Sequence, residues 1–184
     1  MHSYISPDDS FKIEKAITFL VENYKKTGKN PKPVVLHSLR VGMYLLERGY
    51  ETDAIIIGVL HDLLEDSEVS LEDIKRDFSP EIATWVDSVS FKPDIADPVE
   101  QYQEMFNRTI SAGRIPVIVK AADMLANSLY IHLVPDLGKQ RMLLKKMSDF
   151  IKMAEGYSSE PVIKELEARC EKENARLTNL ETKQ

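Results

Sequence analysis

The sequence predicts an all-α domain, and three observations support this prediction. Glycine accounts for only 7 of the 184 residues. No strand–turn–strand pattern, such as Asn-Gly between two alternating apolar runs, is found in the chain. Apolar residues instead recur at intervals of three and four, which is the period of an amphipathic helix. We therefore expect a bundle of helices.

The N-terminal third contains three predicted helices. The first follows the run Pro7–Ser10, which supplies good capping and first-turn residues, and it fades near residues 26–28. A loop with two prolines separates it from a second helix at Val34–Arg48. The third, Thr52–Asp66, is the most apolar. Its isoleucine run is also compatible with a buried strand, but the pattern continues to Asp66 without a break and favours one helix.

The rest of the chain continues in the same way. Ser70 and Asp73 resemble a capping pair at a helix start, and the stretch Phe91–Pro98 is expected to be a loop. The remaining predicted helices are Leu71–Phe78, Glu81–Val89, Val99–Ala112, Pro116–His132, Gly138–Glu155 and Ser159–Leu177. We interpret residues 1–184 as a single domain, with a core at about 10–156, a C-terminal helix at about 159–177 and a frayed polar tail at 178–184.

The composition limits the classes of partner. Hydrophobic residues make up 43% of the chain, which is enough for a substantial core. The formal net charge is −6 and the pI is about 5.3. This acidity argues against nucleic acid or an anionic membrane as a partner, because both require a basic surface.

Cysteine content and the N-terminus bear on the compartment. The single cysteine, Cys170, excludes an intrachain disulfide and a zinc site built from several thiolates, and we expect it to be a passive residue of the C-terminal helix. The N-terminus lacks the pattern of a secretory signal, and no stretch reaches the roughly 18 apolar residues of a membrane span. The expected compartment is the cytoplasm.

A pair of ionisable residues stands out in the most apolar predicted helix. Only four histidines occur, and one of them, His61, is followed directly by Asp62. Two such groups in a buried helix are costly unless another group compensates them. A divalent cation does so, and imidazole nitrogen and carboxylate oxygen suit manganese, iron, zinc and, less readily, magnesium. Glu65 and Asp66 follow one turn later on the same helix face. The segment therefore indicates a metal site with acidic neighbours.

His37 and Asp123 supply two further candidate ligands from other helices. His37 lies near leucines, and Asp123 lies beside two alanines that allow its helix to approach a shared site. Each group also has an ordinary structural interpretation. The His61–Asp62 and Glu65–Asp66 pairs can be polar helix ends. His37 can be a satisfied core histidine, and Asp123 can cap or pair with Lys120. Their occurrence together, in order and on separate helices, favours a shared site.

This order resembles that of the HD-domain phosphohydrolases: a histidine, then His-Asp about two dozen residues later, then an aspartate in an apolar helix. The resemblance is strongest to the hydrolase domain of the RelA/SpoT family and its small stand-alone relatives, which remove the 3′-pyrophosphate from ppGpp and pppGpp. It extends over about residues 16–130. The matching stretches are 34–41, 58–67, 78–83, 86–89 and 114–127. The resemblance implies an HD-domain helical bundle.

The same resemblance implies the roles of individual residues. One divalent cation, usually Mn²⁺ in this branch, with Fe²⁺, Zn²⁺ or Mg²⁺ as alternatives, would be held by four side chains. These implied ligands are His37, His61, Asp62 and Asp123. Glu65 and Asp66 would orient or deprotonate the attacking water. The extra histidines of two-metal relatives are missing, which predicts one metal and leaves His132 as a lesser candidate for a spare ligand.

Substrate contacts are implied at two places. Asn127 matches a position that contacts the nucleoside, and the run Lys25-Lys26-Thr27 resembles a stretch that borders the base and phosphates. The two lysines can also be an exposed basic helix end. Lys120 and Arg114 are further candidates for stabilising phosphate charge. The expected partner is therefore a small-molecule nucleotide.

The chain departs from the family pattern at several positions that bear on substrate recognition. Ser38 replaces a proline, and Met124 and Ala126 replace an arginine and a histidine. Two alternatives to an alarmone hydrolase therefore stay open. One is an HD hydrolase of another nucleotide or phosphorylated metabolite, and the other is a non-catalytic module that senses a nucleotide. The oligomeric state, including a homo-oligomer, is also open.

Overall fold

The computed structural model of the chain describes residues 5–24 and 33–182. Every regular element within these ranges is a helix, so the predicted all-α class is confirmed. In chain order the elements are α1 Pro7–Tyr24, α2 Val34–Glu47, α3 Thr52–Leu60, α4 Leu63–Asp66, α5 Leu71–Asp77, α6 Pro80–Val89, α7 Pro98–Ser111, α8 Arg114–Ser128, η1 Ile131–Leu133, α9 Leu137–Met153, η2 Glu155–Tyr157 and α10 Pro161–Glu181.

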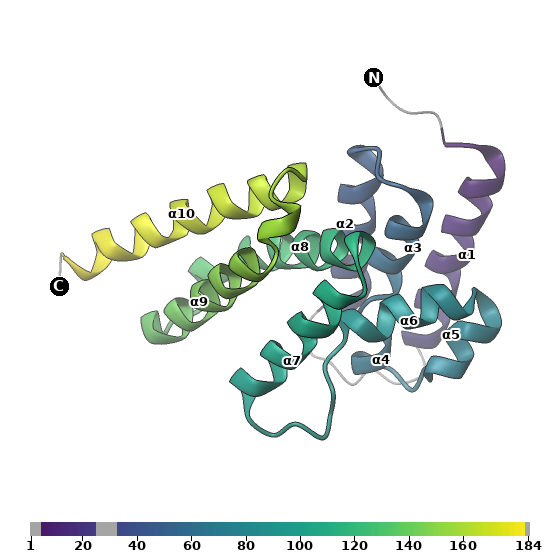
Figure 1. The fold of residues 1–184 in the computed structure, drawn as a ribbon, viewed down its shortest axis with the longest axis horizontal. Helices are drawn as coiled ribbons and strands as arrows, with labels where there is room; N and C mark the ends of the chain where they lie inside the picture. Colours follow the sequence, from purple (N-terminus) through teal and green to yellow (C-terminus); the bar gives the residue numbers. More distant parts are fainter. Residues whose placement is uncertain (1–4, 25–32, 183–184) are drawn as a thin grey trace.

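Helix α3 lies at the centre of the N-terminal part of the chain. Every residue from Ala54 to Leu60 is buried, because α1, α2, α6 and α8 all pack against this helix (Figure 1). A helix that is apolar on all sides is stable only in such a central position. The most apolar segment of the sequence therefore carries His61 and Asp62 into the interior at its C-terminal end.

Helices α2 and α3 approach each other closely at two glycines. A Cβ atom on Gly42 would lie 2.6 Å from a side-chain atom of α3, and one on Gly58 would lie 2.9 Å from a side-chain atom of α2. Any larger residue at either position would force the neighbouring side chain to shift. Gly42 follows His37 on α2, and Gly58 lies about one helical turn before His61 on α3. This contact therefore brings the two histidines onto facing helix ends.

The residues predicted as one helix, 52–66, form two, and that prediction was wrong. A turn at His61–Asp62 separates α3 from α4. The amide of Glu65 donates to the Asp62 carbonyl (3.2 Å), one residue nearer than in an α-helix. The His61 carbonyl instead accepts a hydrogen bond from Ser90 Oγ (3.2 Å). No glycine or proline marks this turn in the sequence, and the hydroxyl that bonds to the His61 carbonyl comes from the distant end of α6.

Two other helix ends differ from the predicted positions. Helix α1 starts inside the predicted capping run, because Ser6 Oγ accepts a hydrogen bond from the Asp9 amide (3.1 Å). Helix α8 ends earlier than predicted, at Ser128, because the amides of Leu129 and Tyr130 bond to carbonyls three residues back. A short 3₁₀ turn, η1, then follows.

The predicted capping pair at the start of α5 is confirmed. Ser70 Oγ accepts a hydrogen bond from the Asp73 amide (3.2 Å), and the Ser70 amide donates to Asp73 Oδ2 (3.0 Å). Two of the unpaired amides at this helix start are therefore satisfied by side chains.

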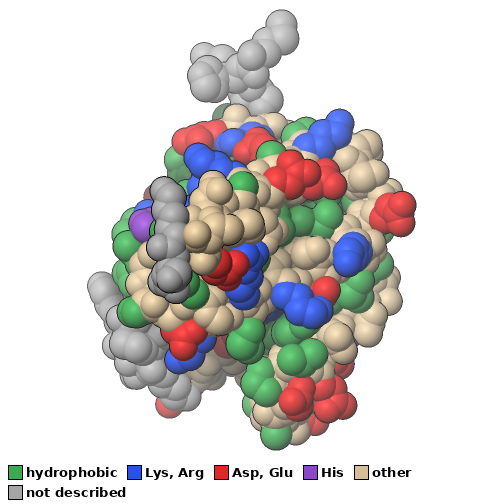
Figure 2. All heavy atoms as spheres, turned by 90° about the vertical axis from the view of Figure 1, so that its left-hand side faces the viewer, with side chains coloured by type: hydrophobic (Ala, Val, Ile, Leu, Met, Phe, Trp, Pro, Cys, Tyr) green, Lys and Arg blue, Asp and Glu red, His purple; other side chains and the backbone are tan. Residues whose placement is uncertain are grey.

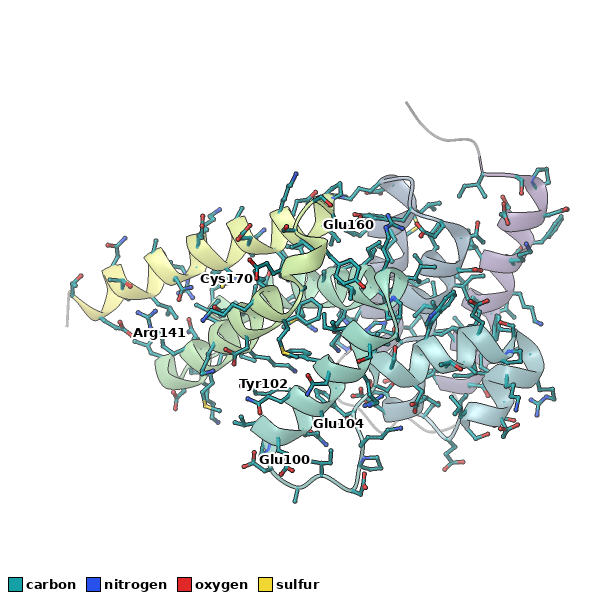
Figure 3. The ribbon with its side chains drawn as sticks, in the orientation of Figure 1. Glu100, Tyr102, Glu104, Arg141, Glu160 and Cys170 are labelled. Carbon is teal, nitrogen blue, oxygen red and sulfur yellow. The ribbon has the colours of Figure 1, made fainter. Side chains whose placement is uncertain are left out.

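Helices α9 and α10 form an antiparallel pair that extends along α8, away from α1 (Figure 1). On the side of α7, the buried rings of Phe106 and Phe150 lie with their centroids 5.0 Å apart. One turn earlier on α7, Tyr102 donates a hydrogen bond to Asp149 of α9 (3.1 Å) (Figure 3). These contacts connect the C-terminal pair to the helices around α3.

The C-terminal helix was predicted to end at about Leu177, and this end was wrong, since α10 continues to Glu181. Arg141 on α9 donates to Thr178 Oγ1 (3.2 Å) and to Glu181 Oε2 (2.6 Å), which holds the last turn in place (Figure 3). Cys170 is buried on the same helix, with its sulfur 3.8 Å from the Leu144 carbonyl oxygen. This environment agrees with the passive role expected for the thiol.

The surface shows charged and apolar side chains in close mixture. On the end of the molecule seen in Figure 2, hydrophobic side chains are exposed among Lys, Arg, Asp and Glu side chains. Across the described residues, none of the helices combines the length and apolar character needed to cross a membrane.

Candidate metal centre

Four buried polar side chains meet where α2, the α3–α4 turn and α8 come together. His37, His61, Asp62 and Asp123 each expose less than a tenth of their surface. His37 lies in the first turn of α2, while Asp123 lies near the middle of α8. The structure therefore brings all four predicted ligands to one place, although they lie up to 86 residues apart in the chain.

The ligand atoms of this cluster lie within reach of one cation. His37 Nε2 is 3.0 Å from Asp123 Oδ1 and 3.3 Å from His61 Nε2. One ligand atom each from these three residues lies within 4.8 Å of the other two. Asp62 joins from the side, with Oδ1 3.2 Å from His61 Nε2 and Oδ2 3.8 Å from His37 Nε2.

The orientation of the His61 ring is set by its own helix. Its Nδ1 lies 2.8 Å from the Gly58 carbonyl oxygen, so this nitrogen carries a proton and donates it. In the neutral ring, the lone pair of Nε2 then points into the cluster, as in most histidines that bind a metal. Burial opposes protonation of Nε2, but the carboxylates of Asp62 and Asp123 outweigh it and raise the pKa of His61 to about 9.

A buried lysine forms part of the same cluster. Lys120 Nζ lies 2.9 Å from Asp123 Oδ2 and donates to the Val89 carbonyl (3.3 Å). Burial disfavours the ionised form of Asp123. Lys120 and the two imidazoles outweigh this effect and hold the pKa of Asp123 well below its usual range. The pairing of Asp123 with Lys120, considered above as an alternative to metal binding, exists beside the histidine contacts rather than instead of them.

The charges of the cluster fit a bound divalent cation. With both imidazoles neutral, the two carboxylates outnumber the single ammonium of Lys120, so uncompensated negative charge is buried. In the chain without a metal, the raised pKa of His61 means that a proton supplies the missing positive charge. Two imidazole nitrogens and carboxylate oxygens are suitable ligands for manganese, iron or zinc. The donor set therefore matches the implied cofactor.

Glu65 and Asp66 lie beyond the turn, at the rim of the cluster. The Glu65 side chain is exposed overall, but its Oε1 accepts a hydrogen bond from the Phe91 amide (2.8 Å). Partial desolvation raises the pKa of Glu65, while the nearby Lys120 opposes this rise. Asp66 is half-buried on the next position of α4. One carboxylate is therefore held at the edge of the site with a strengthened affinity for a proton.

A cavity of about 220 Å³ opens directly beside Asp123. Asn127 lines it and also donates a hydrogen bond from Nδ2 to Asp123 Oδ1 (2.6 Å). The far wall comes from α9, which contributes Leu143, Lys146 and Met147. The sequence pattern pointed to Asn127 but not to the α9 residues, because nothing local distinguishes them from other residues on an amphipathic helix.

Other candidate residues lie elsewhere. Arg114 donates hydrogen bonds to Glu160 and Glu51 at the start of α8, and its suggested role in stabilising substrate phosphates stays a prediction. His132 is exposed in η1 and does not belong to the cluster. The predicted substrate contacts of residues 25–27 lie outside the described residues.

A family model described as "HD domain" matches residues 16–155 of the chain. The chain belongs to the HD-domain family. His37, His61, Asp62 and Asp123 all lie within the matched range, and the predicted HD-domain fold is confirmed.

Two curated relatives carry the same name, guanosine-3′,5′-bis(diphosphate) 3′-pyrophosphohydrolase. The protein from Aquifex aeolicus is 30% identical over 125 residues, which are 66% of this chain and 18% of the relative. That from Borreliella burgdorferi is 29% identical over 138 residues, which are 72% of this chain and 20% of the relative. The chain thus spans about a fifth of the length of these relatives.

A solved structure of similar size shares the fold of this HD domain. It is a metazoan orthologue of SpoT, described as hydrolysing ppGpp, and it matches with a TM-score of 0.74. The match covers 95% of this chain and 97% of that chain at 17% sequence identity. The helices of both proteins are therefore arranged in the same way across nearly their whole length.

Proposed function

We propose that this HD domain is a metal-dependent phosphohydrolase that removes the 3′-pyrophosphate of the guanosine alarmones ppGpp and pppGpp. The observation that carries the proposal is the buried convergence of His37, His61, Asp62 and Asp123. The names of the relatives from Aquifex and Borreliella support the substrate. The proposed compartment is the cytoplasm.

These four side chains would hold a single divalent cation, and Mn²⁺ is the metal we propose. A bound divalent cation would neutralise charge on a phosphoryl oxygen and make a water molecule more acidic. Lys120 keeps Asp123 ionised and turned toward the histidines, because it occupies the other carboxylate oxygen. The hydrogen bond from His61 Nδ1 to the Gly58 carbonyl fixes the ring so that the lone pair of Nε2 can bind the cation.

Glu65 is proposed as the group that takes the proton from the attacking water, with Asp66 assisting its orientation. A general base works best when its pKa is close to the working pH, and desolvation shifts Glu65 in that direction. The Phe91 amide holds Oε1, so the second oxygen of the carboxylate is available for proton transfer. Water then adds to phosphorus as the bond to the 3′-oxygen breaks, which yields GDP and pyrophosphate from ppGpp.

The nucleoside of the substrate would occupy the 220 Å³ cavity beside Asp123. Its lining combines apolar residues, such as Ile131 and Met147, with the polar groups of Asn127 and Lys146. Such a mixture suits a flat base with a few hydrogen-bonding groups. Lys25, Lys26 and Thr27 are proposed to border the phosphates, on the basis of the sequence resemblance alone.

A second candidate is an HD hydrolase that acts on a different nucleotide. Met124 stands where the RelA/SpoT branch has an arginine, and it lines the cavity proposed for the nucleoside. A thioether there removes a fixed cation from the substrate pocket, which changes the balance of charge that the substrate meets.

The test is a metal-dependent turnover assay on purified protein. With Mn²⁺ and ppGpp we expect GDP and pyrophosphate in equal amounts. His61→Ala should lose both bound metal and turnover, because one of the ligand nitrogens is removed. Glu65→Gln should keep its metal and lose turnover by a factor of about 10²–10⁴, the usual contribution of a general base. Metal content is measured by mass spectrometry of the purified variants.

Glu81→Gln, at an exposed position on α6, is the matched control and should behave like the wild type. Turnover of other nucleotides with none of ppGpp would favour the second candidate. Full ppGpp turnover by His61→Ala would disprove the proposed metal centre.

A further inference from the structure

A second cavity, of about 450 Å³, lies between α2 and α10. We call it the α2–α10 groove. Helix α8 forms its floor with short or apolar side chains, and α2 and α10 form its walls. Its lining residues are Arg40, Tyr44 and Arg48 from α2 and its C-cap, Ala122, Leu125, Ala126 and Leu129 from α8 and its C-cap, and Glu165, Ala168, Arg169 and Lys172 from α10.

The charge of the groove is opposite to that of the whole chain. Four cationic side chains line it, whereas Glu165 is its only carboxylate among the described residues. Glu165 is already bonded to Arg48 through both oxygens, at 3.0 and 2.9 Å. The remaining cations therefore give the groove a net positive charge, in a chain whose formal net charge is −6.

Three of these cations have no acidic partner among the residues that the structure describes. Within the part of the chain that the structure describes, Arg40, Arg169 and Lys172 form no ion pair. Like charges on facing helices repel each other, although water screens them, so their accumulation around one cavity favours the binding of an anion. A guanidinium also presents donors in a planar fork that matches two oxygens of a phosphate group.

We propose that the α2–α10 groove binds a soluble, phosphate-bearing small molecule with a flat apolar group, such as a nucleotide, at a site separate from the metal centre. The volume lies within the range of small-molecule sites. Arg169 and Lys172 would hold the phosphates. The short side chains of Ala122 and Ala126 leave room for a ring to lie against the floor.

The groove and the metal centre lie on different faces of α8. Ala122 and Ala126 line the groove, while Asp123 and Asn127, the next residues along, face the cavity beside the metal centre. One contact joins the two cavities. Arg40 of the groove donates a hydrogen bond to the hydroxyl of Tyr130, which lines the other cavity.

This contact gives the groove a means to influence the substrate. The Arg40 guanidinium also lies 5.5 Å from the centroid of the Tyr130 ring. An anion in the groove competes for that guanidinium and releases Tyr130. Ligand bound in the groove therefore changes the KM for substrate more than kcat, a consequence that rests on the proposed function.

Binding is tested on the full chain in EDTA, so that no metal draws the probe to the centre. The probes are ADP and inorganic pyrophosphate, and their binding is measured by calorimetry. The charge-reversed variant Arg169→Glu/Lys172→Glu should bind ADP at least about tenfold more weakly than the wild type. The control Lys152→Glu/Lys164→Glu makes the same change of charge at exposed positions outside the groove and should bind like the wild type.

Equal weakening in both variants, or no binding of either probe to the wild type at about 5 mM, would overturn the proposal. In an NMR titration, ADP should shift the amide of Ala168, and shifts confined to Asn127 and its neighbours would count against the groove. Phosphatidylserine vesicles that sediment the wild type but not the groove variant would assign the cations to lipid head groups instead.

The link to catalysis is tested separately in the turnover assay. Adding ADP should change the KM of the wild type and leave that of the groove variant unaltered. If the protein is inactive but still binds ADP through Arg169 and Lys172, the proposed function is refuted and the proposed groove site still stands. An active protein whose KM responds to ADP equally in both forms refutes the link through Arg40.

Discussion

Helix α8 separates two charged regions, one with buried and paired charges and the other with exposed and mostly unpaired charges. On one face, Asp123 and Lys120 are almost completely buried, and each charge has a partner of opposite sign within 3 Å. On the other face, the cations of the α2–α10 groove gather beside one another and remain open to solvent. Charges that are hidden from water depend on one another for stability. Exposed charges can remain unmatched, which leaves them available for a ligand.

The largest expected effect comes from removing a charge on the buried face. Asp123→Asn keeps the side-chain volume but leaves the Lys120 ammonium without its closest anion. We expect the free energy of unfolding in EDTA to fall by about 3–5 kcal/mol, which is typical of a broken buried ion pair. Urea denaturation followed by circular dichroism measures this change.

The matched exposed change is Glu181→Gln, which breaks the ion pair with Arg141 at the end of α10. Its expected cost is below about 1 kcal/mol, because water replaces the lost partner. Similar losses in the two variants would show that the pair around Asp123 is hydrated rather than buried.

The next effect is a pH dependence that belongs to the buried face alone. The pKa of His61 is about 9 in the folded chain without metal, above the ordinary value of 6.5. A raised folded pKa adds stability that is fully present below pH 6.5 and is lost as the pH rises through 9. The loss amounts to roughly 3 kcal/mol at most. Urea denaturation in EDTA between pH 6 and 9.5 measures it.

The exposed histidine provides the comparison for this prediction. His132→Gln should keep the decrease in stability with pH, whereas His61→Gln should remove most of it. A wild type whose stability is constant over this range would mean that His61 carries no proton in the absence of metal.

The smallest effect concerns a neutral buried group. Ser38 Oγ is buried beside His37 and makes no hydrogen bond with any residue in the described ranges. Ser38→Ala removes this unsatisfied hydroxyl and should raise the free energy of unfolding by about 1 kcal/mol. The control is Ser88→Ala, which removes a hydroxyl that donates to the Trp85 carbonyl (2.7 Å) and should lower stability by a similar amount. Thermal melts of both variants distinguish the two signs.

Most of the fold could be predicted from apolar periodicity, because each long helix buries a regular stripe. The turn at His61–Asp62 could not, since no local signal marks it and the hydroxyl that bonds to the His61 carbonyl comes from Ser90, far along the chain. The extension of α10 to Glu181 depends in the same way on Arg141 from another helix. Local patterns locate helices, whereas tertiary hydrogen bonds accompany the end of α3 and the last turn of α10.

The candidate site divides along the same line. Residue types and their order suggested which side chains would gather, and the structure brings His37 and Asp123 to the His61–Asp62 turn. The α9 wall of the neighbouring cavity gave no local signal, because Lys146 resembles any lysine on an amphipathic helix. Whether these side chains bind a metal and substrate remains a prediction for the variants above.

The glycine contact between α2 and α3 has a consequence for how a metal would be acquired. Main-chain proximity at Gly42 and Gly58 sets the separation of the two imidazoles, so it is already fixed when folding ends. An arriving ion meets donors that need little rearrangement, and the entropy of assembling them has been lost beforehand. Exchange of one ion for another should then leave the backbone almost unmoved, and the choice among metals would follow supply in the cell.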